Sequence, residues 1–305
     1  MEKVALIELA ENSTKLSIYM TQNGRSKLIR TESDKANISK DIEEEKLLRP
    51  KTISDTVNIL KIYRNIIEEN DVKKIIAVAN DILMQARNQR GFFEEIYNNT
   101  GMSFTFVTEE DFVKNIYTSS CNKIDSSKGT IVYVGSHSTY LIKYNRRTTL
   151  GYDCIPVGYE TITKFGSDFD SMKSAFAEKL VLKNVSLDDE EFVLGEGVPF
   201  VNLGRIAKKI DHYPIEIDNN YPVSHSLEKK VVEFVKGLDL EKVTKVKGLV
   251  EDRTDILISG FAIVSAIYDK LKIKETTIAT ASVRDGIITN SFAAYIQERL
   301  SLIHI

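Results

Sequence analysis

The chain has 305 residues, of which 42% are hydrophobic and 28% charged, with a formal net charge of −3. That length allows two domains with ordinary hydrophobic cores. The small negative charge gives no attraction to nucleic acid, and the longest apolar runs have the length of a strand, too short to span a membrane. We therefore expect neither nucleic acid nor a membrane as a partner.

The cysteines and the first residues indicate the compartment. Cys121 and Cys154 are too few for a disulfide framework and are not in a metal-ligand spacing. Met1 to Lys3 lead straight into a β-type run, without a signal peptide. We read both cysteines as structural thiols and expect a cytoplasmic protein.

The first half of the chain begins with three short β-type runs and a polar stretch, after which helices and strands alternate. Pro50 opens an amphipathic helix, Gly101 fits a left-handed helix end, and Thr108 with Asp111 can cap a later helix. The expected strands are 4–9, 16–20, 27–31, 74–78 and 104–107, and the expected helices are about 52–69, 81–87, 91–100 and 108–122. A polar stretch, 32–46, lies between the third β-type run and the helix that Pro50 opens.

The second half repeats this plan after a candidate linker, Asp125 to Gly129. The expected strands are 130–134, 139–145, 148–155, 191–194 and 276–279, and the expected helices are about 159–180, 200–209, 225–250, 253–271 and from 285 onward. Three strands followed by alternating helices and strands, twice over, resemble the actin-like (ribonuclease H-like) fold. We predict an α/β protein of two such domains, 1–124 and 125–305, with mixed sheets flanked by helices and a cleft between the domains. The last helix, about 286–305, is expected to pack back on the first domain.

A polar loop between two strands occurs twice, 125 positions apart. Serine, threonine, leucine and tyrosine recur as Ser13/Ser138, Thr14/Thr139, Leu16/Leu141 and Tyr19/Tyr144. Backbone N–H groups and hydroxyls in such a turn can hold phosphate. The phosphate-binding candidates are therefore Asn12, Ser13, Thr14, Lys15, Gly135, Ser136, His137, Ser138 and Thr139. The alternative is a pair of ordinary Ser-Thr hairpins that bind nothing.

Seven segments, in the same order, resemble motifs of the exopolyphosphatase / guanosine-pentaphosphate phosphohydrolase (Ppx/GppA) family. Residues 8–16 resemble D-x-G-S-N-S-x-R-L, and residues 133–141 resemble D-I-G-G-G-S-T-E-L. The other segments are 78–88, 100–111, 155–158, 248–260 and 282–288. The resemblance implies hydrolysis of a terminal phosphoanhydride, with carboxylates that activate water and hold Mg²⁺ or Mn²⁺.

The residues that this hydrolysis requires in the family motifs are replaced in this sequence. By the resemblance, the acid positions fall on Glu8, Phe112, Tyr133 and Tyr140, and an expected arginine is Met84. One hypothesis is a catalytically degenerate homologue that binds polyphosphate or (p)ppGpp, or regulates an active relative. The alternative is an active hydrolase that uses Glu8, which is also the candidate metal ligand, with Glu110 or Asp111. The resemblance also implies a homodimer, or a heterodimer with an active relative.

Overall fold

The computed structural model describes residues 2–10, 13–22, 25–121, 124, 126–146, 148–188, 191–214, 218–237 and 256–291. Contacts divide the chain into a first unit, Met1–Phe112 with Ile287–Ile305, and a second unit, Val113–Gly286. This division passes through α4 (Glu109–Cys121), before the linker from which the sequence prediction started the second domain. Residues 283–291 are helical, but most of the predicted helix 286–305 lies outside the described residues, so its packing stays a prediction.

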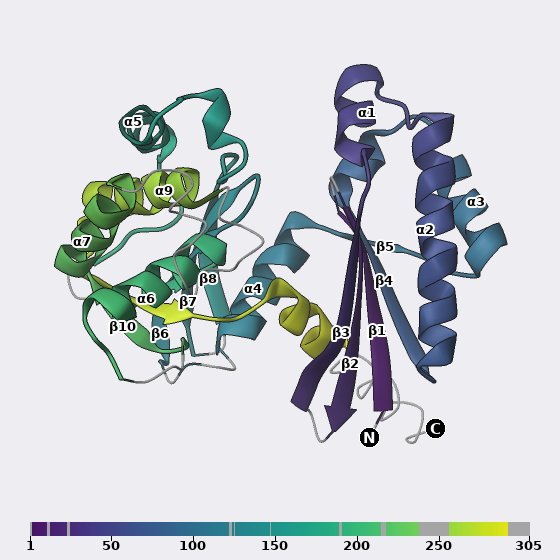
Figure 1. The fold of residues 1–305 in the computed structure, drawn as a ribbon, viewed down its shortest axis with the longest axis horizontal. Helices are drawn as coiled ribbons and strands as arrows, with labels where there is room; N and C mark the ends of the chain where they lie inside the picture. Colours follow the sequence, from purple (N-terminus) through teal and green to yellow (C-terminus); the bar gives the residue numbers. More distant parts are fainter. Residues whose placement is uncertain are drawn as a thin grey trace. The chain divides into compact units, whose positions relative to one another are not determined.

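The first unit contains a five-stranded mixed sheet in the order β3-β2-β1-β4-β5 (Figure 1). Strands β1 to β3 form an antiparallel meander, and β4 and β5 add in parallel beside β1. Its elements are β1 (Glu2–Leu9), β2 (Ser13–Gln22), β3 (Arg25–Lys35), α1 (Ile38–Glu45), α2 (Pro50–Glu69), β4 (Lys74–Asn80), the 3₁₀ helix η1 (Asp81–Gln85), α3 (Gln89–Thr100) and β5 (Thr105–Val107).

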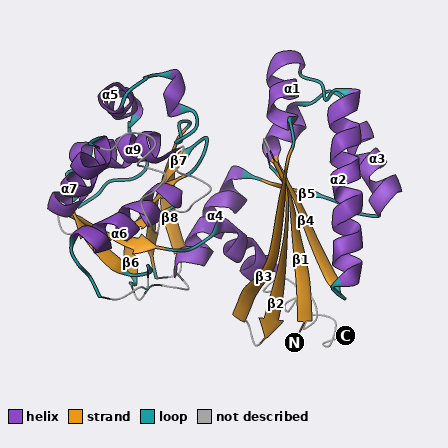
Figure 2. Ribbon diagram, in the orientation of Figure 1, coloured by secondary structure: helices purple, strands orange, loops and turns teal. Residues whose placement is uncertain are grey.

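Helix α2 shows how this unit builds its core. Pro50 occupies the first turn, where its missing N–H costs nothing, and Val57, Leu60, Tyr63 and Ile67 recur at helical spacing on the buried face. The Tyr63 hydroxyl donates to the carbonyl of Thr14 at 2.8 Å, so the helix is tied to β2 at the end of the first hairpin. Figure 2 shows α2 and α3 on one side of the sheet.

The second unit contains a six-stranded sheet in the order β10-β11-β9-β6-β7-β8. Helices α5, α6, α7 and α9 share one core with the sheet face that carries Val132, Val134 and Leu141. Helix α4 lies on the other face, where the rings of Tyr117 and Tyr144 are 5.8 Å apart. The elements are β6 (Lys128–Val134), β7 (Thr139–Asn145), β8 (Thr148–Ile155), the 3₁₀ helix η2 (Ile162–Lys164), α5 (Phe169–Lys179), β9 (Val193–Glu196), α6 (Val198–Ile210), β10 (Tyr221–Ser224), α7 (His225–Lys236), α9 (Leu257–Lys270) and β11 (Glu275–Ala279).

The two sheets repeat one topology. In each, three antiparallel strands are followed by a strand that returns parallel to the first, β4 beside β1 and β9 beside β6. Even an irregularity recurs: the register shifts between Ile18 and Tyr19 in β2 and between Lys143 and Tyr144 in β7, again 125 positions apart. The predicted α/β class with mixed sheets is confirmed.

The polar stretch 32–46, to which the sequence analysis assigned no helix or strand, contains the end of β3 and helix α1. Strand β3 continues to Lys35, and α1 occupies 38–45 with Ile38 and Ile42 fully buried. Charged residues surround Ile38 and Ile42, so their helical spacing of four residues does not stand out in the sequence. The helices predicted within 159–180 are η2 and α5, and α5 begins at Phe169 because Asp168 and Ser171 form a reciprocal cap before it. Among the described residues, no helix is long and apolar enough to cross a membrane.

Glu228 on α7 is fully buried, and its contribution to the folding stability of the protein depends on pH. Burial raises the pKa of this carboxyl from 4.5 to about 7. Nε2 of His225 lies 3.9 Å from a carboxylate oxygen of Glu228 and donates to Asp269 of α9 at 2.9 Å, while Lys173 forms an ion pair with Asp269. Between pH 4.5 and 7 the unfolded chain ionises Glu228 and the folded chain does not, so stability falls as pH rises.

We expect the Glu228→Gln variant to lose this pH dependence. The difference in unfolding free energy between variant and parent should change by about 3 kcal/mol from pH 4.5 to above pH 7, in favour of the variant at the higher pH. Urea unfolding at several pH values measures it. Glu233→Gln, at an exposed position of the same helix, is the matched control. Parallel pH profiles of parent and Glu228→Gln would contradict the assignment.

Candidate functional site

The two predicted loops are equivalent hairpin ends. In the first, the N–H of Ala10 donates to the carbonyl of Ser13 at 2.9 Å, and in the second the N–H of Gly135 donates to Ser138 at 2.9 Å. The cross-strand pairs also correspond, Leu9 with Thr14 and Val134 with Thr139. The predicted duplication of strand, turn and strand is therefore confirmed.

The first loop lies between Glu8 on β1 and Lys15 on β2, which are direct cross-strand partners. Glu8 is half-buried, and its side chain lies on the same face as that of Lys15. Ser13 is partly exposed, whereas Thr14 is fully buried. Asn12 falls outside the described residues.

The second loop is fixed by the turn that follows β8. The N–H of Tyr159 donates to the carbonyl of Gly135 at 3.0 Å, and that of Glu160 donates to the carbonyl of Ser136 at 2.9 Å. A Cβ on Gly158 would lie 2.3 Å from the Gly135 oxygen, so only glycine allows this approach. Both loop carbonyls are thus bound to this turn.

The hydroxyls of the second loop have different surroundings. Thr139 is fully buried and donates to the carbonyl of Val157 at 2.8 Å. Ser136, His137 and Ser138 are partly exposed, and the Nδ1 of His137 lies 2.9 Å from the Ser136 hydroxyl. Among the loop's own residues, these three have side chains that are accessible enough to donate a hydrogen bond to a ligand.

Helix α6 begins beside this loop. Gly197 precedes the helix with φ +101°, and a Cβ there would lie 2.3 Å from the carbonyl oxygen of Val134, at the end of β6. No side chain caps α6. The N–H groups of a helix start carry partial positive charge and are oriented outward along the axis, which favours an anion near this end of β6.

Comparisons with known proteins agree with this geometry. Residues 17–294 match the model of the Ppx/GppA phosphatase family. The chain belongs to this family. A Haemophilus influenzae protein named as a candidate exopolyphosphatase is 21% identical over 293 residues, which cover 94% of this chain and 91% of that protein.

A second relative and a solved structure extend the comparison. The guanosine-5'-triphosphate,3'-diphosphate pyrophosphatase of Pseudoalteromonas atlantica is 20% identical over 300 residues, and the chain spans 58% of its length. The crystal structure of the Aquifex aeolicus Ppx/GppA family member has a TM-score of 0.79 with 20% identity, covering 96% of this chain and 98% of that one. At that identity the structural likeness establishes the shared fold.

Tyrosines occupy two of the positions that the Ppx/GppA resemblance assigns to acids. Tyr133 on β6 and Tyr140 on β7 are direct cross-strand partners, with ring centroids 6.4 Å apart. A Cβ on Gly135 would lie 2.9 Å from Cε1 of Tyr133, so this ring covers the start of the second loop. Tyr140 is 9% exposed and its ring is 6.5 Å from that of Tyr152.

The remaining acid candidates lie around the start of α4. Phe112 is half-buried, and Glu110 is exposed. Asp111 accepts hydrogen bonds from the hydroxyl of Thr108 at 2.8 Å and from its N–H at 3.3 Å. Thr108 in turn accepts from the N–H of Asp111 at 3.1 Å, so the predicted cap is confirmed and Asp111 serves it.

Sequence reasoning missed one buried carboxylate beside these tyrosines. Glu196 is fully buried at the end of β9, is the parallel partner of Tyr133, and accepts a hydrogen bond from Ser120 of α4. Burial and the nearby Glu196 charge raise the pKa of the Cys121 thiol to about 11, so this thiol stays protonated. The sequence Gly195-Glu196-Gly197 before a proline-containing helix start was the available signal.

The residues around the second loop do not fit Mg²⁺ or Mn²⁺. Both ions prefer carboxylate oxygens, and phenol side chains stand where such ligands would be needed. Within the described ranges, no group of three or more His, Cys, Asp or Glu side chains could hold a metal ion. Glu8 remains a candidate metal ligand on the first unit, as the sequence predicted.

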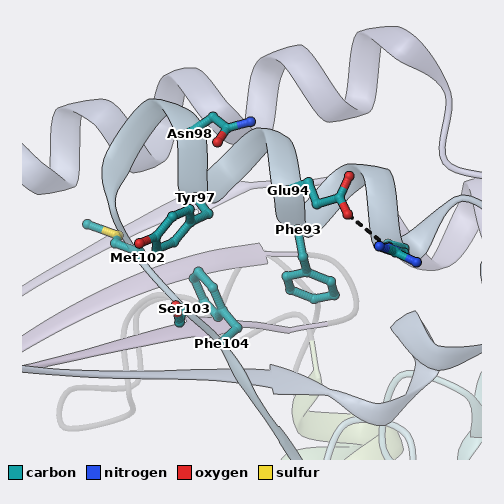
Figure 3. A pocket seen from close by; sticks show the side chains of 8 residues that line it. Phe93, Glu94, Tyr97, Asn98, Met102, Ser103 and Phe104 are labelled. Atoms are coloured by element: carbon teal, nitrogen blue, oxygen red, sulfur yellow. Dashed lines mark hydrogen bonds and ion pairs between the residues drawn. The ribbon is translucent and has the colours of Figure 1, made fainter.

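The first unit also has an open pocket of about 510 Å³ between α3 and the segment that leads into β5 (Figure 3). The rings of Phe93, Tyr97 and Phe104 line it, and Arg90 and Glu94 form an ion pair of 2.9 Å at its rim. Strand β4 separates β5 from β1, so this pocket lies at the sheet edge and not at the first loop.

We expect Gly158→Ala to destabilise the chain by about 2 kcal/mol, because the new methyl group would overlap the Gly135 and Ser136 carbonyls. Denaturant unfolding measures the loss. Gly91→Ala is the matched control: no atom lies within 4 Å of a Cβ at this helical position, so alanine should raise stability by roughly 0.5–1 kcal/mol. Equal stability of Gly158→Ala and the parent would contradict the close packing.

Proposed function

We propose that this Ppx/GppA-family chain binds a phosphate-rich ligand, polyphosphate or (p)ppGpp, without hydrolysing it. The main support is the pair Tyr133 and Tyr140, which face each other across β6 and β7 at positions assigned to acids by family resemblance. A phenol cannot act as the base for a water at neutral pH and is a poor Mg²⁺ ligand. Loss of such groups together costs many orders of magnitude in rate.

The ligand class is supported by both the loop and the relatives. The second loop carries Ser136, His137 and Ser138 beside the start of α6, a set suited to an anion. The two named relatives are described by activities on polyphosphate and on a guanosine pentaphosphate. A chain that binds such ligands without turnover could act as a sensor, as a homodimer or paired with an active relative.

The second candidate function is a metal-dependent hydrolase of the same ligands. Glu8 favours it, since a carboxylate is retained at the end of β1, and Glu110 is exposed and able to contact solvent. Asp111 is less suited because it caps α4. In this alternative Glu8 holds the metal, and Glu110 or Asp111 positions the water.

The two candidates predict opposite results in one experiment. We expect no phosphate release from polyphosphate with Mg²⁺ or Mn²⁺, while isothermal titration of the same preparation detects binding. An active family member serves as the positive control. Phosphate release by this chain that Glu8→Ala abolishes would establish the hydrolase instead.

Restoring the acids should also be insufficient by itself. We expect Tyr133→Asp, Tyr140→Glu and Phe112→Glu together to leave the chain inactive until Met84→Arg is added. Three added carboxylates repel a polyphosphate, and an arginine at the exposed Met84 position would supply balancing charge. Phosphate release by the triple variant alone would contradict this expectation, and Ile62→Arg on α2 tests whether any added arginine suffices.

A further inference from the structure

We propose that the second loop binds its phosphate directly, without a divalent metal, and that the Tyr133 hydroxyl donates a hydrogen bond to it. This inference rests on the proposed function and concerns how the ligand is held. It departs from the metal requirement that the family resemblance implies, because the residues at this loop do not suit Mg²⁺ or Mn²⁺.

The polar groups at this loop are mainly neutral donors. Tyr133 lies half-buried over Gly135, with its ring edge against the loop backbone. Ser136 and Ser138 add hydroxyls, and the first turn of α6 adds the N–H groups of Val198 and Phe200, since Pro199 has none and that of Val201 donates to Gly197. The carbonyls of Gly135 and Ser136 accept from residues 159 and 160, so hydrogen bonds hold them to the turn after β8.

A carboxylate at position 133 would change this balance. A carboxylate facing phosphate places two negative charges together, and a divalent cation between them is the usual way to hold both. A phenol keeps its proton at neutral pH and donates to a phosphate oxygen without a cation. Tyrosine at position 133 therefore replaces a metal-mediated contact by a direct one.

Two carboxylates, Glu196 and Glu160, lie near this loop. Glu196, beside Tyr133, is fully buried and accepts from Ser120 on the opposite side of the sheet from the core helices. Glu160 lies 4.0 Å from Nε2 of His137 and is partly exposed. Glu160 thus weakens any contribution of His137 to anion binding, so the hydroxyl and N–H donors are the groups on which affinity depends.

The test is isothermal titration of the full chain with inorganic tripolyphosphate, in EDTA and in Mg²⁺. We expect binding in EDTA that Mg²⁺ does not strengthen. Tyr133→Phe, which keeps the ring, should weaken binding in EDTA about tenfold, the effect of one hydrogen bond to a charged group. Tyr97→Phe, on the exposed surface of α3, is the control and should bind as the parent does.

Tyr133→Asp gives the converse result. It should bind tripolyphosphate poorly in EDTA and regain affinity when Mg²⁺ is added, with circular dichroism confirming that it folds. Binding by the parent only in Mg²⁺, or an unchanged affinity in Tyr133→Phe, would overturn the inference while leaving the proposed function standing. Absence of binding by the parent in both buffers would overturn the proposed ligand class and the inference with it.

Discussion

The second loop depends on close contacts between backbone segments. Gly158 brings the turn after β8 against the carbonyls of Gly135 and Ser136, and Gly197 brings the start of α6 against the carbonyl of Val134. Neither position has room for a methyl group. Because these contacts join the ends of β6, β8 and β9, the loop, the helix start and the following turn keep one geometry whatever side chains the loop carries.

That constraint explains how the backbone framework of the loop can persist while the side chains on it change. Gly158 and Gly197 are required because they lack a Cβ, which lets the backbone carbonyls of the hairpin approach them closely. The side chains at 133 and 140 are neighbours on the sheet face opposite the core helices, where their two rings pack against each other without a carboxylate. Chemistry at this site can therefore be lost without loss of the fold.

The hairpins, most strands and most helices could be predicted from the sequence, because their apolar periodicity is strong and their turns are polar. Helix α1 was missed because its buried Ile38 and Ile42 are separated by charged residues, and β10 was missed because only four residues pair, beside β11. Glu196 was missed for another reason. A charged residue after a short apolar run is read as the start of a loop, and the hydrogen bond from Ser120 that helps to make its burial tolerable comes from a distant part of the sequence.

The sequence could predict where the candidate site residues lie but not what each one does, because their roles depend on burial and on their hydrogen-bond partners. Thr14 and Thr139 occupy equivalent positions in sequence and in strand register. The hydroxyl of Thr139, however, donates a hydrogen bond to the carbonyl of Val157 inside the protein. Asp111, one residue before the position expected for the base, accepts a hydrogen bond from Thr108 in the N-terminal cap of α4. Conversely, Tyr133 replaces an expected acid but lies against the loop, where a proton donor is useful to an anion. A tyrosine is a poor ligand for a divalent metal but is compatible with binding an anion, since hydrogen-bond donors can balance a phosphate where water is partly excluded.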